Sequence, residues 1–170
     1  MDNSFFAYIQ ELELIAFFSG FPLIYATILV VAGSSNLKQG FKSKLVQLLP
    51  YGYALAGTLY LGLILKNLYP NYSLENIQHP YLTIWGLLAI LFWIPAISKK
   101  TSISLMHSLV IFIVLIKNLL TQLTSSSADI NMVRNDMKIY TASLILNLGT
   151  FACLLLLSFV LNHFRKKIIT

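Results

Sequence analysis

The sequence predicts an all-α integral membrane protein, a bundle of about five transmembrane helices with the N-terminus outside and the C-terminus in the cytoplasm. Of its 170 residues, 57% are hydrophobic and 11% are charged, whereas soluble domains average roughly 45–50% apolar and about 25% charged residues. At roughly 20 residues per crossing, the apolar segments leave no room for an additional soluble domain, so we treat 1–170 as a single transmembrane domain. The predicted crossings are 12–33, 45–68, 81–98, 103–123 and 139–162.

The first two crossings contain residues that shape and pack helices. The first holds Gly20 and Pro22, and a proline inside a helix removes one backbone hydrogen bond, so we expect a kink near its middle. The second is rich in small residues, and Gly52, Ala56 and Gly57 allow a neighbouring helix to approach closely. We therefore expect the second crossing at the tightly packed centre of the bundle.

The last three crossings are defined by their ends. The third has Trp85 and Trp93 toward its two ends, where indole rings anchor helices at the membrane interface. Lys99 and Lys100 then begin a tight turn, which predicts an antiparallel hairpin with the fourth crossing. The polar stretch 124–140 runs into the fifth crossing with helical periodicity, and we expect an amphipathic extension on the bundle surface or against a partner.

The basic residues indicate the orientation, because cytoplasmic loops carry an excess of lysine and arginine. One set of helix ends holds only Lys66, Arg134 and Lys138, while Lys117 lies inside the fourth crossing. The other set holds Lys38, Lys42, Lys44, Lys99, Lys100, Arg165, Lys166 and Lys167. This distribution predicts a multi-pass protein of a cell membrane, of the bacterial inner-membrane type, with its C-terminus inside.

The composition also excludes several kinds of partner. The net charge of +6 is the basic collar that holds cytoplasmic loops against anionic lipid, and no basic–aromatic pattern points to nucleic acid. Cys153 is the single cysteine, so no disulfide framework is available. The stretch from Gly52 to Thr58 has the glycine spacing of a phosphate loop but lacks its lysine, which argues against a nucleotide site.

Lys117 is the residue that most needs an explanation, because a charge inside an apolar helix is costly. In the interpretation we favour, its long stem carries the ammonium to the outer interface. Alternatively, Lys117 pairs with Glu13 on the first crossing, in a polar site within the outer half of the membrane. That site would also use Asn118, beside Lys117, and the helical stripe formed by Ser143, Asn147 and Thr150. Interhelical hydrogen bonding is the more frequent use of such residues.

The histidines do not form a convincing cofactor site. His107 and His163 fall near the internal ends of neighbouring crossings, but their depths do not match as bis-histidine haem ligation requires. We expect neither haem nor a metal. No serine, cysteine or paired-carboxylate constellation indicates catalysis, and no helix centre holds an aspartate or glutamate, which weakens a proton-coupled pump.

The sequence therefore favours a non-catalytic structural or accessory subunit of a larger membrane complex, in contact with other membrane subunits or with copies of itself. Sparse polar residues and the extension before the fifth crossing support this interpretation. The alternative is a small-solute or ion transporter that acts as a homo-oligomer around the Glu13, Lys117 and Asn147 region. We do not expect an enzyme.

Overall fold

The computed structural model describes residues 3–34, 39–69, 77, 80–124 and 130–169, and its regular elements are all helical. This confirms the predicted all-α class for the described residues. The elements are α1 (Asn3–Phe18), α2 (Phe21–Ser34), α3 (Gln39–Leu68), α4 (Pro80–Leu88), the 3-10 helix η2 (Ala89–Trp93), α5 (Pro95–Ser98), α6 (Thr101–Thr124) and α7 (Ile130–Ile169).

Within the described residues, four helical segments are long and apolar enough to cross a membrane. They correspond to the first, second, fourth and fifth predicted crossings. In particular, α1 and α2 form one such segment although a turn separates them. The four segments are Tyr8–Gly33, Gln39–Leu68, Thr101–Thr124 and Val133–Leu161.

The predicted third crossing is not one helix, and the prediction of a continuous helix over 81–98 was wrong. The chain passes from α4 into η2, becomes extended at Ile94 with φ −75° and ψ 119°, and starts again as the short α5. Pro95 explains the break, because its ring disfavours a helical conformation at the preceding residue and it has no N–H to donate. Only Pro80–Trp93 remains as a shorter apolar helix.

The first crossing is broken where a kink was expected. Helix α1 ends at Phe18 and α2 begins at Phe21, with Ser19 and Gly20 forming the turn between them. Pro22 lies in the first turn of α2, where its missing N–H costs no helical hydrogen bond. The break therefore exposes backbone groups between α1 and α2, and a neighbouring element must satisfy them.

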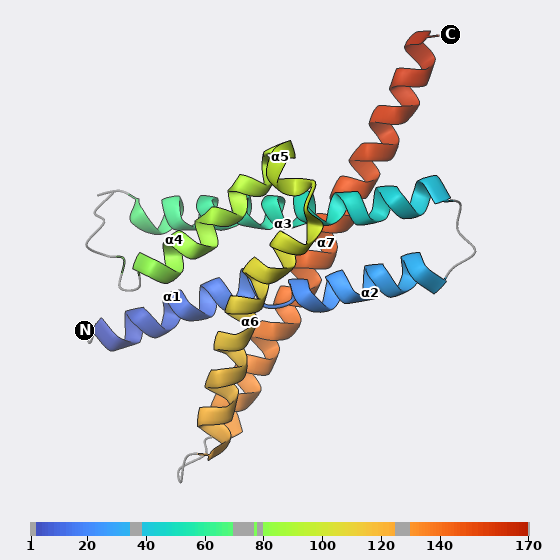
Figure 1. Ribbon diagram of the computed structural model, residues 1–170. Coiled ribbons are helices and arrows are strands. Elements are labelled where there is room, and N and C mark those ends of the chain that lie inside the picture. The colour runs from blue at the N-terminus through green and yellow to red at the C-terminus, as the bar shows by residue number, and fades with distance from the viewer. Residues whose placement is uncertain (1–2, 35–38, 70–76, 78–79, 125–129, 170) are drawn as a thin grey trace.

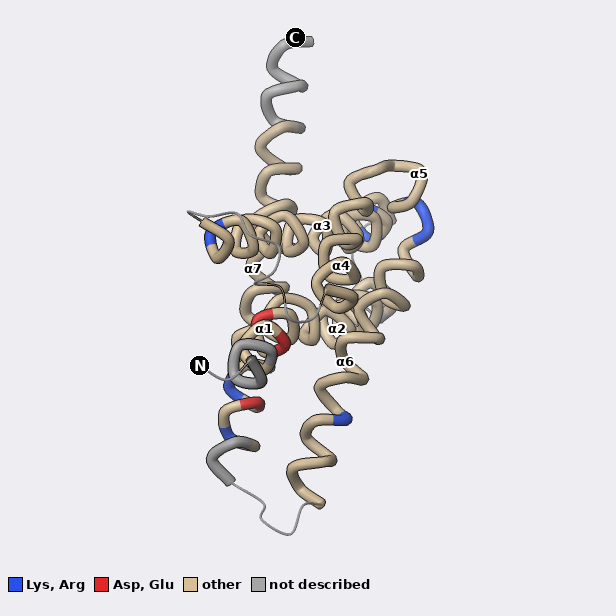
Figure 2. The backbone as a smooth tube through the Cα atoms, turned by 90° about the vertical axis from the view of Figure 1, so that its left-hand side faces the viewer, with Lys and Arg blue, Asp and Glu red and all other residues tan. Residues whose placement is uncertain are grey.

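The helices form two groups that cross steeply (Figure 1). The α1–α2 segment, α3 and α4 run alongside one another, whereas α6 and the first half of α7 form an antiparallel pair directed across them. Figure 2 views the first group nearly end-on and shows α6 and α7 extending past it. Helix α3 contacts α1, α2, α4, η2, α6 and α7, so it occupies the centre of the arrangement.

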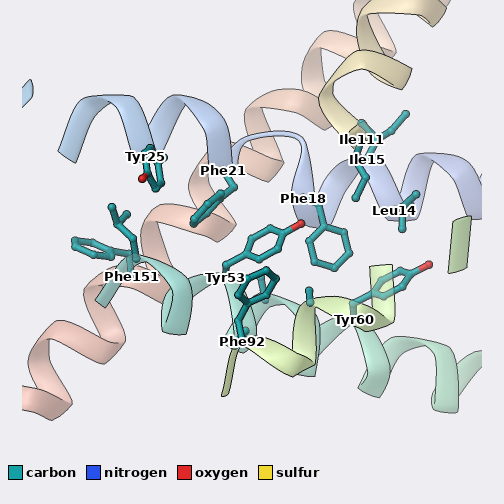
Figure 3. Close-up of a cluster of buried hydrophobic side chains, with 14 of the residues drawn as sticks. Leu14, Ile15, Phe18, Phe21, Tyr25, Tyr53, Tyr60, Phe92, Ile111 and Phe151 are labelled. Carbon is teal, nitrogen blue, oxygen red and sulfur yellow. The ribbon is translucent and has the colours of Figure 1, made fainter. Parts of the chain in front are cut away.

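The core is a cluster of buried aromatic side chains between α1–α2, α3 and η2 (Figure 3). The ring of Tyr53 lies 5.4 Å from that of Phe18, 4.5 Å from that of Phe21 and 5.6 Å from that of Phe92, measured between centroids. Tyr60 stands edge-on to Phe18 at 5.3 Å. Such tilted and edge-on pairs are the arrangements that aromatic quadrupoles favour.

Small residues give α3 its close contacts. Gly52, Ala56 and Gly57 are all buried. A Cβ atom added at Gly57 would lie 2.8 Å from the Cβ of Ala89 in η2, whereas one at Gly52 would lie 3.4 Å from the Cα of Phe151 in α7. Among the glycines of α3, Gly57 is thus the one where a side chain is least easily accommodated.

Candidate functional site

The polar stripe on α7 faces the break between α1 and α2. Ser143, Asn147 and Thr150 are 0%, 2% and 5% exposed. The N–H of Gly20 donates to Ser143 Oγ at 2.9 Å, and Asn147 Nδ2 donates to the carbonyl oxygen of Phe17 at 2.8 Å. These two side chains therefore satisfy one donor and one acceptor that the broken helix leaves without a helical partner.

Gly20 permits this contact because it has no side chain. A Cβ atom there would lie 2.6 Å from the backbone nitrogen of Leu144 and 2.7 Å from the carbonyl carbon of Ser143. The rest of the stripe is bonded locally: Asn147 Nδ2 also donates to the carbonyl oxygen of Ser143 at 2.8 Å, and Thr150 Oγ1 donates to that of Asn147 at 3.0 Å. Ser143 and Asn147 thus hydrogen-bond α7 to the first crossing. Among the described residues of the stripe, Asn147 Oδ1 is the only buried side-chain oxygen without a hydrogen-bond partner.

The structure does not bring Glu13 and Lys117 together. Both carboxylate oxygens of Glu13 accept hydrogen bonds from Asn67 Nδ2 of α3, each at 3.2 Å. Lys117 is exposed on α6. Its neighbour Asn118 donates a hydrogen bond from Nδ2 to Glu11 Oε1 of α1 at 2.9 Å. The acidic residues of α1 are therefore held by amides of α3 and α6.

A second polar site, which the sequence analysis did not predict, joins α1, α6 and α7. We call it the end cluster. Its centre is Asp136, which lies near the start of α7 and is 1% exposed. Tyr8 donates its hydroxyl to Asp136 Oδ1 at 3.3 Å, and Gln122 Nε2 donates to Oδ2 at 3.0 Å. The cluster consists of Tyr8, Glu11, Asn118, Gln122 and Asp136.

The chemistry of the end cluster follows from its donors, which are all neutral. Buried polar groups in an apolar environment need hydrogen-bond partners, and the phenol of Tyr8 and the amide of Gln122 supply two of them to Asp136. Figure 2 shows the acidic positions on α1 and the one on α7, with basic positions beside the latter, and the flanking Arg134 and Lys138 are themselves exposed.

The sequence did contain a signal for Asp136. Counting back seven residues, or two helical turns, from Ser143 leads to Asp136, so this residue continues the stripe of Ser143 and Asn147. We instead assigned the polar stretch 124–140 to an extension outside the crossing. Its partner Gln122 lies in the fourth predicted crossing, on α6.

His107 lies in an aromatic cage on α6. Its Nδ1 is 2.8 Å from the hydroxyl of Tyr53, and the Trp85 ring stacks on the imidazole with 4.6 Å between centroids and 4° between planes. Trp85 Nε1 also donates to the carbonyl oxygen of His107 at 3.2 Å. The side chain of His163, the other histidine considered for haem, lies outside the described residues, and no group of three or more potential metal ligands occurs among those that are described.

Comparison with models of protein families, with curated proteins and with solved structures gives no match. The function is therefore argued from the geometry.

Proposed function

We propose that this chain is a multi-pass protein of the bacterial-type inner membrane, with its N-terminus outside, and that it serves as a non-catalytic subunit of a larger membrane complex. The four long apolar helices support a membrane location. The uneven distribution of lysine and arginine supports the orientation. The five-pass topology takes the broken Pro80–Ser98 segment, which precedes α6 in the chain, as the third pass.

The observation that carries the subunit proposal is the position of Lys117. It lies seven residues before the end of α6, about 10 Å along the helix, and it is exposed. Thr121 and Thr124 follow at helical spacing and are exposed on the same face. Charged residues in membrane helices almost always face a bundle interior and pair there. Because the described residues supply no such interior around Lys117, another subunit is one source of a partner, and the other interpretation is that the long stem carries the ammonium to the outer interface.

The burial of the helices agrees with this proposal. In the most apolar windows of the Tyr8–Gly33 and Gln39–Leu68 segments, 39% and 44% of residues are buried, against 22% and 17% for Thr101–Thr124 and Val133–Leu161. Helices α6 and α7 thus leave most of their surface for lipid or for a partner. Their polar and small exposed residues, such as Thr121 and Gly149, suit helix–helix contact better than contact with lipid alone.

The test is native mass spectrometry after mild detergent extraction of wild-type protein and of Lys117→Met. We expect a stoichiometric foreign subunit with the wild type and its loss with Lys117→Met, while the melting temperature of the isolated chain is unchanged. Lys66→Met, which removes another exposed lysine near the end of α3, is the matched control and should keep the partner. A wild-type chain that is only monomeric or homo-oligomeric would contradict the subunit proposal.

The burial of Asp136 favours a second candidate function, a small-solute or ion transporter that acts as a homo-oligomer. The sequence analysis weighed against proton coupling because no acid was expected inside a helix bundle. Asp136 weakens that objection, since it is a buried acid near the start of the apolar segment Val133–Leu161, and a buried ionisable residue in a membrane helix is a functional candidate by default. Its two carboxylate oxygens accept hydrogen bonds from Tyr8 and Gln122, so side chains of three helices, α1, α6 and α7, meet at this acid.

This second candidate is tested in proteoliposomes that contain a pH-sensitive dye. A potassium gradient with valinomycin should drive a proton flux through wild-type protein, and Asp136→Asn should abolish it. Glu13→Gln, which changes an acid bonded only to Asn67 in the described structure, should leave the flux intact. Equal fluxes in wild type, Asp136→Asn and empty liposomes would exclude proton transport by this residue.

A further inference from the structure

Two adjoining depressions lie at the end of the bundle where basic residues gather. One, which we call the polar pocket after the residue types that line it, has a volume of about 340 Å³ and is lined by Gln47, Tyr51, Ser98, Lys99 and Thr101, together with Pro95. The other is a groove of about 580 Å³ between α3, η2 and α7, lined mostly by leucines with Trp93 and Tyr51. Tyr51 belongs to both, so the polar and apolar depressions meet at this residue. Both volumes fall within the roughly 300–1,000 Å³ typical of small-molecule sites.

We propose that these two depressions bind one anionic phospholipid of the surrounding bilayer, with its phosphate in the polar pocket and an acyl chain along the apolar groove. The division into a polar and an apolar part matches the two halves of a lipid molecule. The break at Ile94 creates this division, because Trp93 before it lines the groove and Pro95 after it lines the pocket.

The polar pocket offers donors and positive charge to a phosphate. Lys99 is exposed and carries the cation. Thr101 accepts a hydrogen bond from the hydroxyl of Tyr25 at 3.3 Å, so its own hydroxyl proton is available to a phosphate oxygen. None of the described residues that line either depression is acidic. The charge of the pocket is therefore complementary to an anionic headgroup and not to a cationic one.

The groove offers apolar surface near a second cation. Trp93 directs its indole N–H to Thr58 Oγ1 at 2.9 Å, so its polar edge needs no further partner. Leu157 is 49% exposed and lines the groove beside Ser158. The carbonyl oxygen of Ser158 accepts from Lys44 Nζ at 3.5 Å, which places a second lysine at the same end of the bundle. An acyl chain in the groove would cover apolar side chains while its headgroup stays beside Lys99 in the pocket.

The experiment measures lipid retention by the intact chain in native mass spectrometry, with phosphatidylglycerol and phosphatidylcholine of identical acyl chains added to the detergent-purified protein. We expect one phosphatidylglycerol to be retained in preference to phosphatidylcholine. Lys99→Gln should weaken phosphatidylglycerol binding about fivefold, the factor that corresponds to about 1 kcal/mol for one lysine at an anionic surface. Lys100→Gln, at the neighbouring exposed lysine outside the pocket, should change it less than about twofold.

The groove is tested by filling it. Leu157→Trp should displace the acyl chain and lower retention of phosphatidylglycerol. Leu156→Trp places the same bulk on an adjacent residue that is 64% exposed and does not line the groove, so it should bind like wild type. Equal losses in Lys99→Gln and Lys100→Gln, or equal retention in the two tryptophan variants, would overturn the proposal. Full competition by glycerol 3-phosphate would identify a site for soluble phosphates and would also overturn it.

Discussion

Replacement of Gly20 by alanine tests the contact on which the broken first crossing depends. The added Cβ would lie 2.6 Å from Leu144 N, whereas ordinary van der Waals contact begins at 3.4 Å, so α7 must move away by about 0.8 Å. Moving α7 also stretches the 2.9 Å bond from Gly20 N to Ser143 Oγ. Overpacking costs about 1–3 kcal/mol and an interhelical hydrogen bond about 0.6 kcal/mol, so we expect a loss of about 2 kcal/mol.

The assay is equilibrium unfolding by dodecyl sulfate in mixed micelles, followed by far-ultraviolet circular dichroism. Gly149→Ala is the matched control, because Gly149 lies on α7 with nothing within 4 Å of an added Cβ. Alanine is the better helix former by about 1 kcal/mol, so this control should be neutral or stabilising. If Gly20→Ala and Gly149→Ala unfolded at the same dodecyl sulfate fraction, the close contact of the break with α7 would be refuted.

Three further predictions concern single contacts. Ser143→Ala leaves a buried N–H of the broken helix unbonded, and the same unfolding assay should show a loss of about 1 kcal/mol, whereas Ser143→Thr should recover part of it if the hydroxyl is what counts. Tyr53→Phe removes the 2.8 Å hydrogen bond to His107 while keeping the ring; a loss of about 1 kcal/mol is expected, and no change would mean that ring packing alone holds this pair. In a Cys153→Ser background, a cysteine that replaces Lys99 should be shielded from an impermeant thiol reagent in intact cells, and a cysteine that replaces Thr124 should react. The reverse labelling pattern would invert the proposed orientation.

The long apolar segments could be predicted because composition and length alone decide whether a helix can cross a membrane. The break at Ile94 could also have been read from Pro95, but the apolar run around it was weighted more heavily than the proline. The end cluster was harder to predict, because a single aspartate in a polar stretch looks like a loop residue. Its burial depends on α1 and α6 lying against the start of α7, and no local pattern specifies that packing.

The candidate site could be predicted only in part, because a local sequence pattern does not specify how helices pack against one another. Periodicity placed Ser143, Asn147 and Thr150 on one face of α7, and the structure places that face inside. Periodicity does not say which element a face meets, however. The pairing of Glu13 with Lys117 was argued from depth alone. In the structure, Glu13 instead accepts a hydrogen bond from Asn67, and Asn118 donates one to Glu11. Choosing among polar partners at similar depth requires the crossing geometry of whole helices.

The hydrogen bonds that close the break between α1 and α2 have a consequence for how the chain is made. The N–H of Gly20 and the carbonyl of Phe17 find their partners on Ser143 and Asn147, more than a hundred residues later in synthesis. During synthesis, the segment formed by α1 and α2 therefore lacks these two partners until α7 has been made. A chain that ends before α7 would leave these two backbone groups without these partners, so the first segment depends on the last one for its own backbone bonding.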